Sequence, residues 1–128
     1  MAYYFSKTLN TSFEEAENKV KEELKKEGFG VLTEIDVQAT LKTKIGEDFR
    51  KYKILGACNP NLAHKALLAE AQIGTMLPCN IVIQENEDKK VEVSVVDPIK
   101  SMQAIKNQEL ESVATEAQGK LKKVIESL

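Results

Sequence analysis

Hydrophobic and polar residues alternate along the chain with two different periods, and the pattern predicts strands separated by helices. Apolar residues that recur every three or four positions mark an amphipathic helix, whereas those that recur every second position mark a strand with one buried face. The short polar segment at residues 86–90 predicts a hairpin between the last two strands, and residues 38–46 are predicted to form a short helix or turn. The pattern predicts strands at 2–9, 29–37, 51–57, 80–85 and 91–97, and helices at 12–28, 60–74, 98–105 and 107–128.

Polar residues at the predicted helix starts support these boundaries. Ser12 and Glu15 have the spacing of a capping box, in which the two side chains satisfy free backbone N–H groups of the first turn. The pairs Asn59-Pro60 and Asp97-Pro98 each place a capping side chain directly before a proline. Proline is favoured in the first helical turn because a backbone N–H at that position would have no hydrogen-bond partner within the helix. Asn107 is predicted to cap the last helix.

The predicted strand at residues 29–37 carries two carboxylates on one face. Strand alternation places Glu34 and Asp36 on the same side. They are candidates for acid/base chemistry if a cleft buries them, although two carboxylates on the outer face of a strand are more often solvated. The opposite side is expected to face the core and consists of Val31, Thr33, Ile35 and Val37.

Composition limits the class of protein. The 128 residues are expected to form a single domain, residues 1–128, because this length is enough for one hydrophobic core. Charged residues make up 30% of the chain, but the net charge is only −2 and the sequence pI is about 5.6. Nucleic-acid binding normally leaves a basic surface, so this balance argues against a nucleic-acid partner.

The sequence contains no signal for export or membrane insertion. The first residues, MAYYFSKTLNTSF, lack the basic start, apolar run and small-residue cleavage site of a signal peptide. The uncharged stretch from Ala71 to Gln84 is too short to span a bilayer and is interrupted by Gly74 and Pro78. We therefore expect a cytoplasmic protein with no membrane partner, whose thiols stay reduced and form no structural disulfide.

The only two cysteines are each followed by asparagine, as Cys58-Asn59 and Cys79-Asn80. Cys58 lies directly before the cap of a predicted helix, whose positive end would stabilise a thiolate, so Cys58 is the better candidate for a reactive thiol. Both cysteines also fit a simpler interpretation as small buried hydrophobic residues, because free cysteine is among the most buried residue types. These four residues are the candidates for a ligand or thiol site.

Four segments carry a resemblance to a known family: GFGVLTEIDVQATLKTKIG, YKILGACNPNLAHKAL, GTMLPCNIVI and VEVSVVDPIKSM. Together they resemble the uncharacterised prokaryotic family called domain of unknown function 302, over nearly the whole chain. The resemblance implies an α+β fold, a two-layer α/β sandwich with TATA-box-binding-protein-like topology and a largely antiparallel five-stranded sheet. It also implies a homodimer. It implies no activity, because the family has no agreed one, and the topology does not imply DNA binding.

Whether the two cysteines meet depends on how the strands at 51–57 and 80–85 run. If these strands are parallel, Cys58 and Cys79 lie about 17–20 Å apart at opposite ends and share no site. If they are antiparallel, the segment GTMLP must return the chain along the intervening helix, and five residues reach about 17 Å against about 18 Å for a twelve-residue helix. The residues leave both arrangements open. The resemblance favours the antiparallel one, in which both Cys-Asn pairs lie at the same end of the sheet.

A small-ligand pocket is the leading functional hypothesis if the cysteines meet. Its apolar walls would come from Leu55, Met76 and Leu77, joined by a few polar groups such as Asn59 and Asn80. We therefore expect a homodimeric, non-enzymatic binding or interaction module with a small-molecule ligand. The sequence contains no recognisable catalytic motif and identifies no cofactor.

Two other hypotheses use the same cysteines. In a thiol-dependent enzyme or redox protein, Cys58 would be the nucleophile and Cys79 its resolving partner, although the chain has no Cys-x-x-Cys pair. In a soft-metal site for zinc or copper, His64 would join the two sulfurs. The spacing of these residues matches no standard zinc pattern, and His64 lies on a lysine-flanked helix face where we expect it to be exposed.

Overall fold

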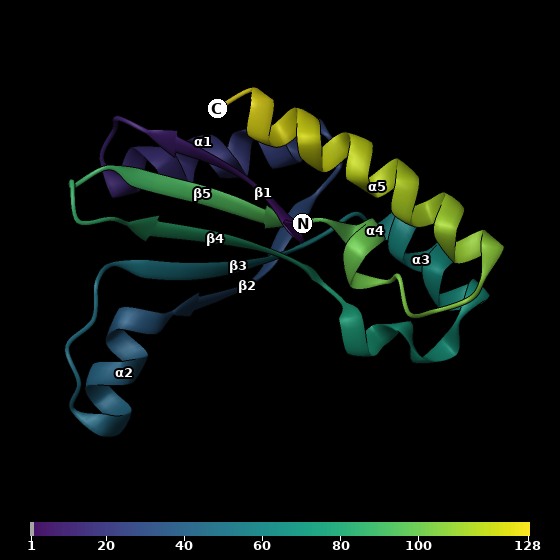
Figure 1. The fold of residues 1–128 in the computed structure, drawn as a ribbon, viewed down its shortest axis with the longest axis horizontal. Coiled ribbons are helices and arrows are strands. Elements are labelled where there is room, and N and C mark those ends of the chain that lie inside the picture. The colour runs from purple at the N-terminus through teal and green to yellow at the C-terminus, as the bar shows by residue number, and fades with distance from the viewer. Residues whose placement is uncertain (1) are drawn as a thin grey trace.

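Five antiparallel strands form one curved sheet, with long helices packed on one of its faces (Figure 1). The computed structural model describes residues 2–128. The strands are β1 Tyr4–Leu9, β2 Gly30–Asp36, β3 Tyr52–Cys58, β4 Cys79–Glu85 and β5 Val91–Val96. Their order across the sheet is β1-β5-β4-β3-β2, and every neighbouring pair is antiparallel. The expected α+β class and the five-stranded antiparallel sheet are confirmed.

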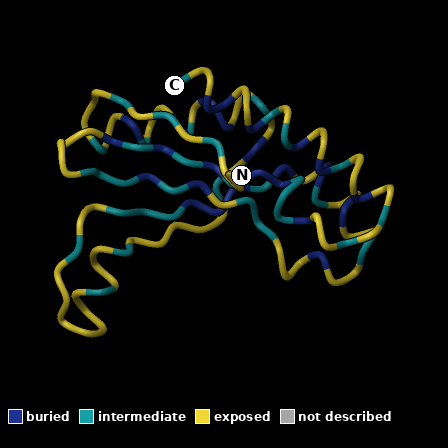
Figure 2. Tube along the Cα trace, viewed as in Figure 1, coloured by how far each residue is buried: buried dark blue, intermediate teal, exposed yellow. Residues whose placement is uncertain are grey.

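Two long helices cover one face of the sheet, and shorter helices lie at its ends (Figure 1). The helices are α1 Phe13–Lys26, α2 Val37–Ile45, α3 Pro60–Ala69, α4 Pro98–Ser101 and α5 Gln108–Glu126, with a 3-10 helix, η1, at Ala71–Met76. The first half of α5 packs with α3 and α4 beyond the end of the strands. In contrast, α2 projects from the β2–β3 edge and has no buried residue (Figure 2). No helix within residues 2–128 is long and apolar enough to cross a membrane.

Polar side chains cap the helix starts that the sequence predicts. The hydroxyl oxygen of Ser12 accepts the backbone N–H of Glu15 at 3.1 Å, which confirms the predicted start of α1. The predicted caps Asn59, Asp97 and Asn107 likewise each accept a backbone N–H of the helix that follows. These bonds satisfy donors that a helix leaves free at its first turn, and they fix where each helix begins.

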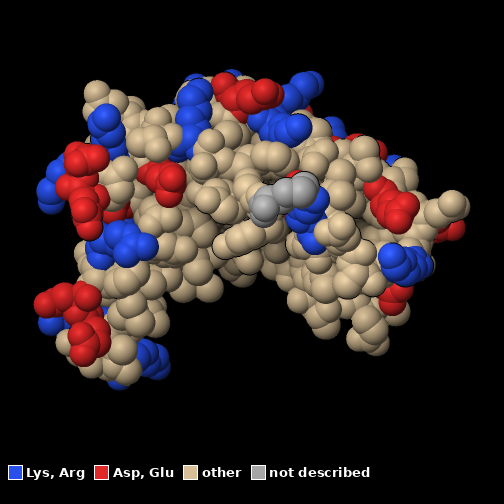
Figure 3. Space-filling model, in the orientation of Figure 1, with Lys and Arg blue, Asp and Glu red and all other residues tan. Residues whose placement is uncertain are grey.

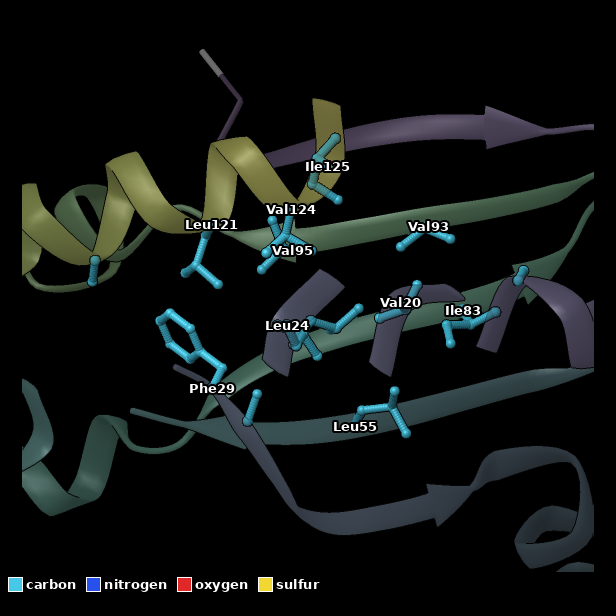
Figure 4. Close-up of a cluster of buried hydrophobic side chains, with 14 of the residues drawn as sticks. Val20, Leu24, Phe29, Leu55, Ile83, Val93, Val95, Leu121, Val124 and Ile125 are labelled. Carbon is cyan, nitrogen blue, oxygen red and sulfur yellow. The ribbon is translucent and has the colours of Figure 1, made fainter. Parts of the chain in front are cut away.

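The main hydrophobic core fills the space between the sheet and the covering helices (Figure 4). Phe29 closes this core just before β2 begins. The fully buried side chains of the main core include Val20, Leu24, Leu55, Ile81, Ile83, Val91, Val93, Val95, Leu121 and Val124. A second, smaller cluster joins α3, η1, α4 and α5 beyond the end of the sheet and contains Ala66, Ile73, Met102, Leu110 and Ala114. The chain therefore builds a helical lobe next to the sheet layer, and the candidate site lies where the two meet.

A β-bulge near the start of β2 reverses the predicted orientation of that strand. Val31 lies opposite Ala57 of β3, but Thr33, two positions further on, lies opposite Gly56, only one position back along β3. The extra residue shifts the alternation of side chains by one. Ile35 therefore points to the open face of the sheet and is 47% exposed. The prediction that this set faces the core is wrong beyond the bulge, and only Val31 packs against the core.

The third helix is shorter than its apolar stripe predicts. It ends at Ala69, Glu70 takes an extended conformation, and the chain continues as η1. The side chain of Asn107 donates a hydrogen bond to the carbonyl of Ala69 at 2.8 Å, so the start of α5 satisfies a group at the end of α3. Ile73 remains fully buried, as the stripe predicts, although it lies in the 3-10 helix. The last part of the predicted α-helix is therefore a 3-10 helix, held in place by tertiary packing.

Candidate functional site

The antiparallel pairing of β3 and β4 brings the two cysteines to the same end of the sheet. Ala57 of β3 lies directly opposite Cys79, the first residue of β4, and Cys58 is the next residue after Ala57. The 3-10 helix η1 and the residues after it return the chain from the end of α3 to the start of β4. This register selects the antiparallel arrangement, which the family resemblance favoured, over the parallel one.

Both cysteines line one small cavity between the end of the sheet and the helical lobe, which we call the cysteine cavity. Its volume is about 40 Å³. Because one water molecule needs about 10–15 Å³ on this measure, the cavity has room for about three water-sized groups. Six of its wall residues come from different segments of the chain: Cys58, Ala63, Leu77, Cys79, Met102 and Ala114.

The walls of the cysteine cavity offer almost no free hydrogen-bonding group. Apart from the two thiols, Asn59 is the only polar residue among the described residues that line it. The side-chain oxygen of Asn59 accepts the backbone N–H of Leu62 at 3.2 Å, and its nitrogen donates to the carbonyl of Glu27 at 3.3 Å. Both ends of this amide are therefore engaged in the protein, and the cavity suits an apolar or soft ligand better than a polar one.

Gly56 allows the segment before β4 to close one wall of the cavity. A Cβ atom at this position would lie 2.7 Å from Cγ of Pro78 and 2.2 Å from Oγ1 of Thr33. Both distances are well below van der Waals contact, so only glycine permits this approach. Pro78 follows a cis peptide bond with Leu77 and lies against the sheet beside Cys79. Gly56 therefore has a packing role at the site.

The two cysteines are half-buried, and neither forms a disulfide. Cys79 packs against the main core. Burial, together with the neighbouring Cys58, raises the pKa of the Cys79 thiol to about 11. A buried thiolate loses its hydration, and no lysine, arginine or histidine among the described residues lines the cavity to replace it. Cys79 is therefore almost entirely protonated at neutral pH.

Asn80 lies on the other face of the sheet from the core-facing residues of β4. It is exposed, whereas its neighbours Cys79 and Ile81 are half-buried and buried. Asn80 lines an adjoining, more open hollow of about 270 Å³ together with Met76, and Cys79 and Met102 line both hollows. Leu55, which the sequence suggested as a pocket wall, is instead fully buried in the main core. Of the expected apolar walls, only Leu77 lines the cysteine cavity.

The two carboxylates of β2 have structural partners and lie away from the cysteine cavity. The bulge turns Glu34 towards the helix side, where it forms ion pairs with Lys21 at 3.1 Å and with Lys53 at 3.6 Å. Asp36 is the N-cap of α2 and accepts the backbone N–H of Ala39 at 3.0 Å. These contacts occupy both side chains and favour the structural interpretation over acid/base chemistry.

His64 is exposed on α3, as expected, and does not line the cysteine cavity. Within residues 2–128, no three His, Cys, Asp or Glu side chains gather in an arrangement that could hold a metal ion. The combination of Cys58, Cys79 and His64 therefore has no geometric support.

Met102 is the wall residue of greatest chemical interest that the sequence did not single out. It is 8% exposed and carries a third sulfur to the walls of the cavity that both cysteines line. It caps the end of α4, whose start is set by the Asp97-Pro98 pair. That pair was a local signal for the helix, but no local signal connects residue 102 with residues 58 and 79, because only the tertiary fold brings them together.

The fold and the cavity define the class: a two-layer α+β domain with one uncovered sheet face and a thiol-lined cavity at the end of its strands. The family described as domain of unknown function DUF302 matches residues 5–128, and the chain belongs to this family. The crystal structure of an uncharacterised conserved DUF302 protein from Bacillus stearothermophilus is similar, with a TM-score of 0.92. The two chains are 24% identical over 99% of this chain and 98% of the other, which shows the fold. No curated protein is significantly similar in sequence.

Proposed function

We propose that this protein is a non-enzymatic binding module of the cytoplasm, which acts as a homodimer and holds a compact ligand in the cysteine cavity. The observation that carries this proposal is the convergence of six separate parts of the chain on one cavity with both cysteines in its walls. Ligand sites are typically concave, mostly apolar and lined by few polar groups, and this cavity has that character.

The size and chemistry of the cavity restrict the ligand. A volume of about 40 Å³ accommodates a compact ligand and excludes a nucleotide or a sugar. The amide of Asn59 is already engaged at both ends, so a ligand with several hydrogen-bonding groups would lose its hydration without gaining partners. The remaining contacts are with carbon and sulfur, which favour a small apolar or soft ligand.

The uncovered face of the sheet supports the homodimer. The long helices cover only one face, and the bulge directs Ile35 to the other, where it lies opposite Ile54, which in turn lies opposite Val82. Figure 3 shows that uncharged side chains mainly border the concavity between α2 and η1. A second copy on this face would remove an exposed apolar row from water, which is the main driving force for association.

The thiol-dependent alternative has one observation in its favour, since both thiols line the same cavity. The raised pKa of Cys79 counts against it, because the thiolate is the reactive form in thiol–disulfide exchange. A binding role requires no thiolate in the absence of ligand, so the binding module is the better match to the site.

Xenon is a suitable probe for the cavity, because it is compact and apolar and enters small dry cavities in proteins. We expect xenon to shift the amide NMR signals of cavity residues such as Cys58 and Cys79. The variant Ala63→Leu, which places a larger side chain in the wall, should abolish these shifts. Ala39→Leu lies on the exposed helix α2 and should leave them unchanged. Shifts that are absent from the wild type, or that persist in Ala63→Leu, would contradict the proposed site.

The homodimer is tested by sedimentation at micromolar concentration. We expect a mass of twice that of the 14.3 kDa chain. Ile35→Lys places a charge in the uncovered apolar row and should give the monomer mass. Leu68→Lys changes an apolar residue on α3 that is more exposed than Ile35, 75% against 47%, and should leave the dimer intact. A wild-type mass near 14.3 kDa would contradict the dimer.

A further inference from the structure

Three sulfur-containing residues line the cysteine cavity from three separate parts of the fold. Cys58 ends β3, Cys79 begins β4 and Met102 follows α4. Met102 is 8% exposed and belongs to the helical lobe, so the cavity joins a residue of the lobe to two residues of the sheet. Met76, by contrast, is 39% exposed and does not line the cysteine cavity, although it lines the adjoining hollow near Asn80.

We propose that the compact ligand of the cysteine cavity is a monovalent copper ion, Cu(I), bound by the sulfur atoms of Cys58, Cys79 and Met102. This inference rests on the proposed function, since it names the ligand class of the same site. Soft thiolate and thioether sulfur atoms are ligands that Cu(I) prefers. A bare ion is also the type of ligand that a volume of about 40 Å³ accommodates.

The set of wall residues favours copper over zinc. Zinc in proteins is almost always held by four ligands drawn from thiolate, imidazole and carboxylate groups. Within the described residues that line the cavity there is no histidine, aspartate or glutamate, and Asn59 is engaged elsewhere. A thioether is a poor partner for zinc and a good one for Cu(I). Met102 is therefore the residue that discriminates between the two metals.

The start of α3 offsets part of the charge of the proposed complex. Binding replaces the protons of the two thiols, so one Cu(I) ion enters, two protons leave and the copper–dithiolate unit carries a net charge of −1. No electron is transferred. Cys58 directly precedes Asn59, the cap of the ten-residue helix α3, whose N-terminal end carries a partial positive charge. The apolar walls keep water from competing for the ion.

The decisive experiment is an anaerobic titration of the reduced full-length protein with Cu(I), supplied as its acetonitrile complex, against a chromogenic Cu(I) chelator. We expect one Cu(I) per chain and an X-ray absorption spectrum with only sulfur in the first coordination shell. Met102→Leu, which preserves the shape of the side chain, should weaken binding at least about tenfold, the loss that removal of even an outer ligand typically causes. Met76→Leu should bind as the wild type does.

Two outcomes would overturn the copper site: a stoichiometry well below one, or Met102→Leu binding Cu(I) as tightly as Met76→Leu does. Circular dichroism and thermal unfolding of both variants, measured without metal, establish that a loss of binding is not a loss of fold. The xenon measurement separates the two proposals. If xenon enters the cavity and Cu(I) does not bind, the ligand class is wrong and the binding cavity stands. If neither binds, both proposals fail.

Discussion

The side-chain amide of Asn59 donates a hydrogen bond to the backbone carbonyl of Glu27, 3.3 Å away, and so joins the start of α3 to the end of α1. The same amide caps α3 through its oxygen. Gly28 lies beside this amide with a φ of +82°, and a Cβ at Gly28 would lie 3.0 Å from Nδ2 of Asn59. One buried side chain therefore positions the helix that begins next to Cys58.

Substitutions of Asn59 should separate its two hydrogen bonds. Asn59→Asp keeps a good capping oxygen but loses the donor to Glu27, and we expect a cost of about 1 kcal/mol in the free energy of unfolding. Asn59→Ala loses both bonds and should cost about 2 kcal/mol. Urea unfolding measures these values. Asn61→Ala, exposed in the first turn of the same helix, serves as the control and should change stability by less than about 0.5 kcal/mol. Equal stability of Asn59→Asp and the wild type would show that the donor bond contributes nothing.

Gly56→Ala should destabilise the protein through overpacking. The new methyl group would lie 2.2 Å from Oγ1 of Thr33 and 2.7 Å from Cγ of Pro78, and we expect a loss of about 1–3 kcal/mol on unfolding by urea. Adding Thr33→Ala removes one of the two clashes and should restore part of the loss. Gly30→Ala is the matched control in the neighbouring strand, because a Cβ there meets nothing within 4 Å. A loss in Gly30→Ala as large as that in Gly56→Ala would exclude the packing explanation.

The Cys79 thiol should react slowly and with a steep pH dependence. In a Cys58→Ser variant, where Cys79 is the only thiol, the alkylation rate with iodoacetamide should still be rising above pH 9, because burial, the larger of the two causes that raise the pKa of Cys79, remains in this variant. The same protein in denaturant should show an alkylation midpoint near the ordinary cysteine pKa of about 8.5. A rate that levels off near pH 8.5 in the native protein would mean that the native thiol is as ionisable as a free cysteine.

Glu17 should contribute stability that is lost in acid. Burial raises the pKa of its carboxyl, but hydrogen bonds from Lys21 and Lys53 outweigh burial and hold the pKa below its ordinary value. A carboxyl with a lowered native pKa stabilises the fold above its unfolded pKa of about 4.3, and this contribution is lost as the pH falls through the native pKa. Between about pH 5 and pH 3 the wild type should therefore lose more stability than Glu17→Gln does, by on the order of 0.5–1 kcal/mol.

Glu14→Gln provides the control for this comparison. Glu14 is an exposed residue of the same helical turn, and no ion pair of the described residues includes it. Its pH profile should follow that of the wild type. If the wild type and Glu17→Gln lost the same stability as the pH falls, Lys21 and Lys53 would not lower the pKa of the Glu17 carboxyl in solution.

Local signals in the sequence predicted most of the fold. The caps at Ser12, Asn59, Asp97 and Asn107 all lie where helices begin, because each side chain acts on backbone groups only two or three residues away. The polar segment at 86–90 predicted the β4–β5 hairpin for the same reason. Interactions of short range along the chain can be recognised without knowing the tertiary structure.

The features that the sequence did not predict depend on partners far along the chain. The bulge in β2 is defined by how β2 pairs with Gly56 of β3. The alternation of side chains within β2 alone therefore predicted the wrong face for Ile35. The end of α3 depends on Asn107, 38 residues after Ala69. At the site, the sequence identified both cysteines as candidates, but it did not determine whether they lie close together. Met102 could not be connected with them before the helical lobe was known.

The bulge in β2 also bears on how the chain behaves at high concentration. β2 forms one edge of the sheet and exposes Leu32 and Ile35, which would make a regular strand here a template for adding strands from other molecules. The bulge breaks the even spacing of backbone groups along this edge, and α2 ends the strand at Asp36. At the other edge, β1 is only six residues long and carries Lys7 in its middle. The molecule therefore resists strand-by-strand aggregation, although its sheet is not closed into a barrel.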